Sequence, residues 1–165
     1  MHNELQTRPA LRAIVAVAVL LGMFGPTTAS RSAADAPADD KAKKAVQEVL
    51  DAQQAAWNKG DLEAFMAGYW KSDDLSFYSG GEKTKGWQAT LDRYKKKYQG
   101  EGKEMGTLTF SELDISVANA DNAIVRGRWQ LKFKDGKTAG GLYTLWFRKV
   151  PDGWRIVHDH TSKAD

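Results

Sequence analysis

The spacing of apolar residues changes once along this chain, from a helical period to an alternating one. Between residues 41 and 98, apolar side chains recur every three or four positions, which is typical of amphipathic helices. Between residues 107 and 161, they recur every second position, which is typical of strands with one buried face. These two periods predict an α+β domain in which helices come first and a curved antiparallel sheet follows.

Three helices are predicted in the first half of the chain. The first begins at Lys41 and ends near Gly60, which suits the left-handed residue after a helix. Asp61 can cap a short second helix, and residues 87–98 form the third. The run Lys95-Lys96-Lys97 is interpreted as a solvated face of that third helix. The predicted buried stripes are Val46, Val49, Leu50, Gln53 and Trp57, then Leu62, Phe65, Met66 and Tyr69, then Trp87, Leu91, Tyr94 and Tyr98.

Five strands are predicted, and turn-forming residues separate them. A short strand covers residues 75–78, and the four longer ones cover residues 107–117, 122–134, 140–150 and 154–161. Asp135-Gly136 indicates a two-residue hairpin turn. If Lys134 then pairs with Lys137, and Val150 pairs with Trp154, the register assigns every strand residue to one of two faces.

One predicted face is polar and the other is aromatic. The polar face contains Arg126, Arg128, Tyr143, Asp159 and Thr161, and the aromatic face contains Trp129, Trp146, Trp154, His158 and His160. On the polar face, the arginines could hold an anionic or carbonyl-bearing ligand while Tyr143 donates a hydrogen bond. Asp159, if desolvated, could act as a general base. The alternative is a solvated face with a cross-strand ion pair of little energetic value. A bulge at Gly140-Gly141 would shift the register.

The two histidines that flank Asp159 allow two interpretations. His158 and His160 point the same way along a strand and could supply two metal ligands, although a metal site usually needs a third. Otherwise they are hydrogen-bonded histidines of a core or an interface. The chain has no cysteine, which excludes disulfides and thiolate zinc sites. Its net charge of +3 is too small to indicate nucleic-acid binding, and no cofactor motif is recognised.

The N-terminus has the pattern of a targeting segment. Arg8 and Arg12 precede the uncharged run at residues 13–25, which is shorter than the ~20 residues of a membrane-spanning helix. Small residues follow up to Ala29, so we expect a secretory signal peptide over residues 1–29 and a secreted or periplasmic protein. An uncleaved N-terminal anchor is the alternative. Residues 30–40 are small and polar and are expected to form a flexible leader to a domain over residues 41–162.

Two motifs resemble those of a known family. Residues 56–65, Ala-Trp-Asn-Lys-Gly-Asp-Leu-Glu-Ala-Phe, are similar to the helix junction of the nuclear transport factor 2-like superfamily. Residues 154–162, Trp-Arg-Ile-Val-His-Asp-His-Thr-Ser, resemble the closing strand of its SnoaL-like branch. The chain is also similar to the association domain of calcium/calmodulin-dependent protein kinase. The resemblance covers residues 41–162, nearly all of the chain beyond the expected signal peptide.

The resemblance implies a cone-shaped sheet wrapped around a long helix, a fold also described as cystatin-like. The mouth of such a cone often holds a ligand, and its outer face often forms a homodimer. By this resemblance Arg128 takes the place of a pocket arginine of the association domain. The expected ligand pocket contains Trp87, Tyr94, Tyr98, Arg126, Arg128, Tyr143 and Thr161. The expected interface contains Trp129, Trp146, Trp154, His158 and His160.

Three functions remain open at this level. The first is binding of a small, polar or anionic organic molecule without chemistry. The second is a cofactor-independent isomerase, cyclase or lyase that uses Asp159 as its acid–base group. In it, Tyr94 or Tyr143 together with Asp159 could imitate the paired tyrosine and aspartate of an isomerase. The third is an assembly module that acts through the aromatic face. Because one fold serves many functions in this superfamily, the resemblance does not choose among them.

Overall fold

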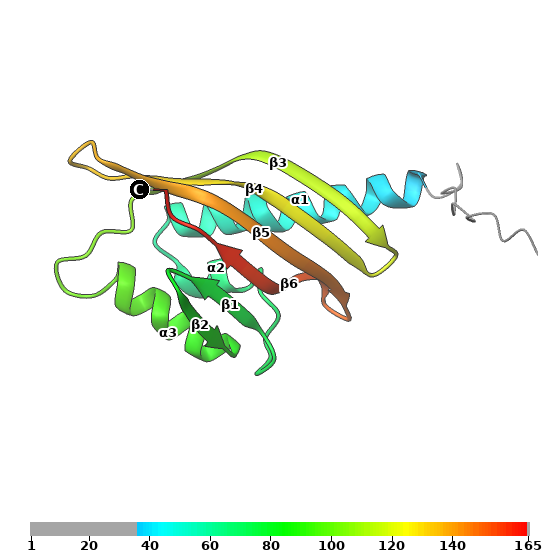
Figure 1. The fold of residues 1–165 in the computed structure, drawn as a ribbon, viewed down its shortest axis with the longest axis horizontal. Helices are drawn as coiled ribbons and strands as arrows, with labels where there is room; N and C mark the ends of the chain where they lie inside the picture. Colours follow the sequence, from blue (N-terminus) through cyan, green and yellow to red (C-terminus); the bar gives the residue numbers. More distant parts are fainter. Residues whose placement is uncertain (1–35, 165) are drawn as a thin grey trace, which may run out of the picture. The chain divides into compact units, whose positions relative to one another are not determined.

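The computed structural model describes residues 36–164. This part of the chain contains three helices and a six-stranded sheet (Figure 1). The helices are α1 (Ala36–Asn58), α2 (Leu62–Met66) and α3 (Trp87–Tyr98). The strands are β1 (Ser76–Ser79), β2 (Glu82–Lys85), β3 (Thr107–Asn119), β4 (Asn122–Lys132), β5 (Thr138–Val150) and β6 (Gly153–Thr161). The α+β class and the order of helices before a meander are confirmed.

Helix α1 begins at Ala36, five residues earlier than predicted. Residues 36–40, which we expected in the flexible leader, are therefore helical. Pro37 is tolerated there because first-turn N–H groups have no partner within the helix. Asp39 in the first turn also interacts favourably with the positive end of the helix dipole. The expected signal peptide and the rest of the leader lie outside the described residues. No helix of residues 36–164 is long and apolar enough to cross a membrane.

The Trp57-Asn58 pair joins the end of α1 to strand β3. The Trp57 indole N–H donates to the Gly106 carbonyl at 3.1 Å. The Asn58 amide donates to the Leu108 carbonyl at 3.0 Å and accepts from the Leu108 N–H at 2.7 Å. Gly60 then reverses the chain with a positive φ of 79°, as its position after the helix predicts. This motif therefore has a structural role, since it fixes the helix against the edge of the sheet.

The sheet has the strand order β2-β1-β6-β5-β4-β3. All neighbouring pairs are antiparallel except β1 and β6, which are parallel, so the sheet is mixed rather than wholly antiparallel. Strand β2 was not predicted, because its residues Glu82-Lys83-Thr84-Lys85 do not alternate between apolar and polar. Strands β3, β4 and β5 curve over α1 (Figure 1). The core lies between this inner face of the sheet and the helices.

The predicted register between β4 and β5 is wrong by one residue. Phe133, not Lys134, pairs with Lys137, because the Phe133 N–H donates to the Lys137 carbonyl at 2.9 Å. The loop is therefore Lys134-Asp135-Gly136, with Gly136 in the left-handed region at φ 83°. This three-residue loop, a turn closed by a left-handed glycine, competes with the two-residue turn that Asp-Gly also favours. A shift of one residue moves every side chain of a strand to the opposite face.

The corrected register separates the residues that the sequence had grouped. Arg126 pairs with Thr144 and Arg128 with Leu142, which places both arginines on the outer face. Their neighbours on β4 point inward, and these are Val125, Gly127, Trp129 and Leu131. Trp129 is thus on the inner face, not on the aromatic outer face where we expected it.

Strands β5 and β6 follow the predicted register at one end of their pairing. Tyr143 pairs with Thr161, and Leu145 with Asp159, as predicted. A bulge between Trp146 and Phe147 then changes the register, so Val150 pairs with Gly153 instead of Trp154. Beyond this bulge Trp154 points into the core and is buried, which removes it from the expected interface.

Candidate functional site

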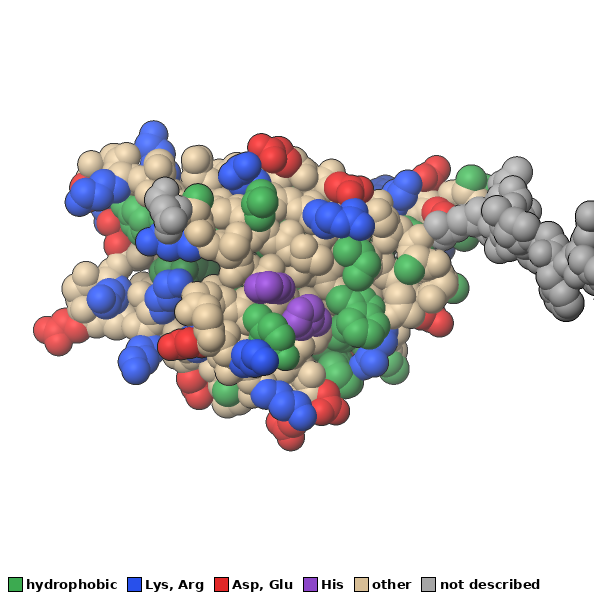
Figure 2. Space-filling model, in the orientation of Figure 1, with side chains coloured by type: hydrophobic (Ala, Val, Ile, Leu, Met, Phe, Trp, Pro, Cys, Tyr) green, Lys and Arg blue, Asp and Glu red, His purple; other side chains and the backbone are tan. Residues whose placement is uncertain are grey.

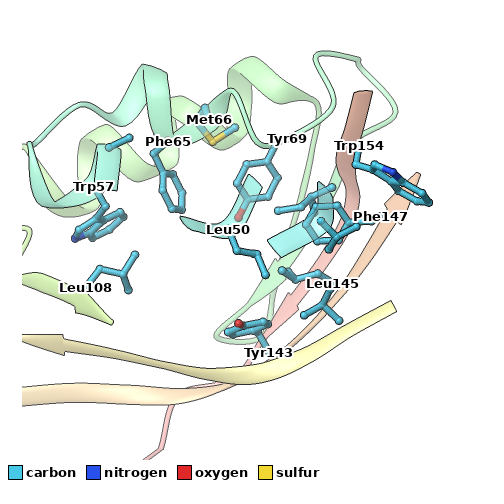
Figure 3. Close-up of a cluster of buried hydrophobic side chains, with 14 of the residues drawn as sticks. Leu50, Trp57, Phe65, Met66, Tyr69, Leu108, Tyr143, Leu145, Phe147 and Trp154 are labelled. Atoms are coloured by element: carbon cyan, nitrogen blue, oxygen red, sulfur yellow. The ribbon is translucent and has the colours of Figure 1, made fainter. Parts of the chain in front are cut away.

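A cavity of about 80 Å³ lies between the helices and the inner face of the sheet. This volume holds a few water molecules or one small organic group, whereas sites for drug-sized ligands have roughly 300–1,000 Å³. Figure 3 shows side chains from the helices facing side chains from the strands around this region. The cavity walls are mainly aromatic: Trp57, Phe65, Tyr69, Phe77, Tyr94, Tyr98, Phe110, Trp129 and Tyr143.

The aromatic walls are packed against one another. Phe77 and Tyr94 stack with ring centroids 5.4 Å apart, and Tyr94 in turn stacks on Tyr98 at 6.0 Å. Across the cavity Phe110 meets Tyr143 edge-on at 5.5 Å. Such contacts favour fixed ring orientations, so the shape of the cavity is established before any ligand enters.

Asp159 is the acidic side chain of the cavity and is 3% exposed. Its Oδ2 accepts a hydrogen bond from the Tyr69 hydroxyl at 2.7 Å, and its Oδ1 accepts one from Thr161 Oγ1 at 2.6 Å. Burial raises the pKa of Asp159 to about 6, although the two hydrogen bonds and the charge of His160 act in the opposite direction. A carboxyl group with this pKa can both accept and donate a proton near neutral pH.

Tyr69 and Tyr94 extend the polar centre of the cavity. Their hydroxyl oxygens lie 3.4 Å apart, and Tyr69 also donates to Asp159. Burial, followed by the nearby charge of Asp159, raises the pKa of both tyrosines well above 10. Both hydroxyls therefore keep their protons at any physiological pH and can serve as hydrogen-bond donors.

The hydroxyl of Tyr143 is buried and has no hydrogen-bond partner among residues 36–164. Gly127 on the neighbouring strand makes room for it, since a Cβ at Gly127 would lie 2.6 Å from that oxygen. Burial, and then the charge of Asp159, raises the pKa of Tyr143, so the group remains a neutral donor. An unpaired buried hydroxyl costs about 1–3 kcal/mol, which a ligand that accepts its hydrogen bond would recover.

Asp159, the predicted general base, lines the cavity together with four of the seven predicted pocket residues, namely Tyr94, Tyr98, Tyr143 and Thr161. Three others do not. Trp87 donates its indole N–H to the Met66 carbonyl at 2.9 Å and lies outside the cavity lining. Arg126 forms an ion pair with Asp114 on the outer face, and Arg128 forms one with Glu112 at 3.1 Å. For the arginines the alternative of a solvated face with ion pairs is therefore correct, with partners on β3.

The outer face of the sheet contains Trp146, His158 and His160 of the expected interface. His158 Nδ1 and Ser76 Oγ lie 2.6 Å apart, and the Tyr78 ring meets both histidines edge-on. Burial, and then the charge of His160, lowers the pKa of His158. Figure 2 shows the two histidines together on this face beside hydrophobic side chains. No cluster of three possible metal-binding His, Asp or Glu side chains occurs within residues 36–164.

Tyr69 lines the cavity although it is not among the predicted site residues. We assigned Tyr69 to the buried stripe of the second helix, and it is indeed 4% exposed. It lies after the end of α2, where a bridge to Ile156 aims its hydroxyl at Asp159. Trp57, Phe77 and Phe110 were missed for a similar reason. A cavity-lining aromatic and a core aromatic have the same spacing along the chain, so the local sequence contains no signal that separates them.

The fold of this chain is similar to those of several proteins whose structures have been solved. A protein of unknown function from Shewanella oneidensis, described as NTF-2 like, is 38% identical, with a TM-score of 0.67 over 73% of this chain and 98% of that one. An NTF2-like superfamily protein from Salmonella enterica is 20% identical, with a TM-score of 0.59 over 79% and 93%. A ketosteroid isomerase-like protein from Erwinia carotovora is 22% identical, with a TM-score of 0.60 over 74% and 95%. No curated protein gives a match.

A family model supports the same assignment over most of the chain. The model of the SnoaL-like domain matches residues 46–165, a range that includes α1 from its first buried residue and all six strands. The match also contains Asp159 and every aromatic wall of the cavity. With this match and the relative from Shewanella oneidensis, the chain belongs to the SnoaL-like domain family of the NTF2-like superfamily.

Proposed function

We propose that the domain binds a small organic molecule whose polar group accepts a hydrogen bond from Tyr143. The observation that carries this proposal is the buried Tyr143 hydroxyl, which no group within residues 36–164 satisfies. Native proteins pair nearly all buried polar atoms, so an unpaired hydroxyl beside a cavity points to a bound partner. Gly127 allows the Tyr143 hydroxyl to occupy this position, because a Cβ at residue 127 would lie 2.6 Å from that oxygen.

The part of the molecule that enters the cavity is a neutral group, such as a ketone. The two arginines that suggested an anion are on the outer face, and the acidic side chain of the cavity is Asp159. A second carboxylate beside Asp159 would suffer like-charge repulsion in an environment that excludes water. A carbonyl oxygen accepts a hydrogen bond without that penalty, and the aromatic walls suit the carbon atoms next to it.

We expect Tyr143→Phe to weaken the binding of cyclohexanone, a small ketone probe, about threefold to tenfold. The reason is that the substitution removes one hydrogen bond and leaves the rest of the cavity unchanged. Trp57 and Trp129 line the cavity, so their fluorescence reports the titration. Tyr78→Phe is the matched control, because Tyr78 lies on the outer face beside the histidines. An unchanged affinity in a folded Tyr143→Phe protein would contradict the proposal.

A second candidate function is proton transfer to and from carbon. Asp159 supports it, because its pKa near 6 suits a general base at neutral pH and its two hydroxyl donors hold it in place. In this reaction Asp159 removes a proton from the carbon next to the carbonyl. The C–H electron pair becomes the new C=C π bond while the carbonyl π pair moves onto the oxygen, and the resulting enolate oxyanion accepts the Tyr143 hydrogen bond. Returning the proton to the same or another carbon gives exchange or isomerisation without a cofactor.

We also propose that the outer face pairs two copies of the chain. Leu142 and Trp146 are exposed there, by 54% and 44%, although large apolar side chains on strands usually pack against something. Trp146→Glu would put a charge in the middle of such an interface. We expect it to convert a dimer into a monomer at micromolar concentration, as measured by light scattering after size-exclusion chromatography. A wild-type monomer at that concentration would count against the interface.

A further inference from the structure

Two charged side chains belong to the cavity, and they lie at different depths. Asp159 is buried, whereas Lys97 near the end of α3 is exposed and still lines the cavity. The cavity therefore reaches the surface beside Lys97. Its Nζ lies 5.1 Å from the centre of the Tyr98 ring, which is itself part of the cavity wall. The site thus has a negative interior and a positive rim.

The three lysines of α3 have different surroundings. Lys95 pairs with Glu63 at 2.9 Å. Lys96 is exposed and does not line the cavity. Lys97 follows Tyr94 by three positions, so it shares the helix side that carries Tyr94 and Tyr98. It has no acidic partner within the described part of the chain, which leaves its ammonium group available to an anion at the rim.

We infer that the ligand is an amphipathic monocarboxylate, with a small neutral head in the cavity and its carboxylate at the rim on Lys97. This inference rests on the proposed binding function and adds the class and the orientation of the ligand. The cavity of about 80 Å³ admits only a small head, so the rest of the molecule extends toward the opening. At that opening the carboxylate keeps part of its hydration and gains an ammonium partner.

The opposite orientation is disfavoured by charge. A carboxylate beside Asp159 would be buried with a second acid and with hydroxyls that already donate to that acid. The outer-face arginines offer no alternative for a ligand in the cavity, because each is paired with an acid of β3. Lys97 is therefore the one cation of the cavity lining in residues 36–164 that can select an anionic end.

The test compares two probes that share a cyclohexanone head. The first is 3-(4-oxocyclohexyl)propanoate, and the second is the corresponding propanamide, which has the same shape without the charge. For the wild-type protein we expect the carboxylate to bind about fivefold tighter than the amide. Lys97→Met should abolish that preference, whereas Lys96→Met, which changes a lysine outside the cavity lining, should retain it. The preference should also shrink in high salt, since an exposed ion pair is screened.

The outcomes separate this inference from the proposed function. If the amide and cyclohexanone bind but the carboxylate binds no tighter than the amide, the inference is wrong and the binding function stands. The same conclusion follows if Lys96→Met and Lys97→Met reduce the preference equally. The preference then comes from the general positive charge of the surface and not from Lys97 at the rim. If neither the amide nor cyclohexanone binds, the proposed function itself is wrong.

Discussion

Asp159→Asn is expected to slow the exchange of the α-protons of cyclohexanone for deuterium by a factor of about 10²–10⁴. In the wild-type protein the carboxylate removes the proton while the Tyr143 hydroxyl stabilises the developing oxyanion. Asparagine has nearly the same shape but cannot take up the proton. Proton NMR in D₂O follows the loss of the α-proton signal directly, and it requires no knowledge of the natural substrate.

Two further proteins make this measurement decisive. Asp92→Asn changes an exposed acid of α3 that accepts a hydrogen bond from Gln88 and does not line the cavity, so it should exchange at the wild-type rate. Tyr143→Phe should slow exchange as well, because the oxyanion loses its donor. If the wild-type protein exchanges no faster than Asp159→Asn, acid–base catalysis is excluded for this ketone. Binding without chemistry then becomes the better description of the site.

The same carboxyl group is expected to make the protein less stable as the pH rises. The folded state holds the Asp159 proton up to about pH 6, while the unfolded state releases it near the ordinary value of 3.8. Between these values the folded state binds more protons, so its stability falls with rising pH and the full loss is present above pH 6. A shift of this size corresponds to roughly 3 kcal/mol.

Urea unfolding at several pH values measures this effect as a difference between two proteins. Asp159→Asn lacks the titration, so its free energy of unfolding should gain roughly 2–2.5 kcal/mol relative to wild type between pH 4 and pH 7. The other carboxyl groups titrate in both proteins and cancel from the difference. A constant difference across this pH range would mean that Asp159 has an ordinary pKa in the folded protein. If Asp159→Asn also loses the proton exchange, a rise in its free energy of unfolding relative to wild type would show that the site retains a charged group at the expense of stability.

Most of the helices and strands could be predicted from the sequence because their signals are local. The helix over residues 87–98 and the cap at Asp61 were predicted where they occur. Strand β2 and the first five residues of α1 were not predicted, since β2 is wholly polar, residues 36–40 are small or acidic, and neither segment has an apolar period. The β4–β5 register was missed by one residue because Asp135-Gly136 fits a two-residue and a three-residue loop equally well. That single choice moved Arg126 and Arg128 out of the cavity and Trp129 into it.

The sequence by itself determined the α+β class and the family, and it singled out Asp159 as a candidate site residue, because periodicity and the closing-strand motif are properties of consecutive residues. Only the tertiary structure decided what surrounds that carboxyl group. Tyr69 reaches it across 90 positions of the chain, and burial in the aromatic cavity raises its pKa to about 6. The Tyr143 hydroxyl without a partner in residues 36–164 and the rim lysine Lys97 were likewise revealed by packing. Desolvation and hydrogen bonding depend on neighbours in space, and those neighbours are set by strand register and helix placement.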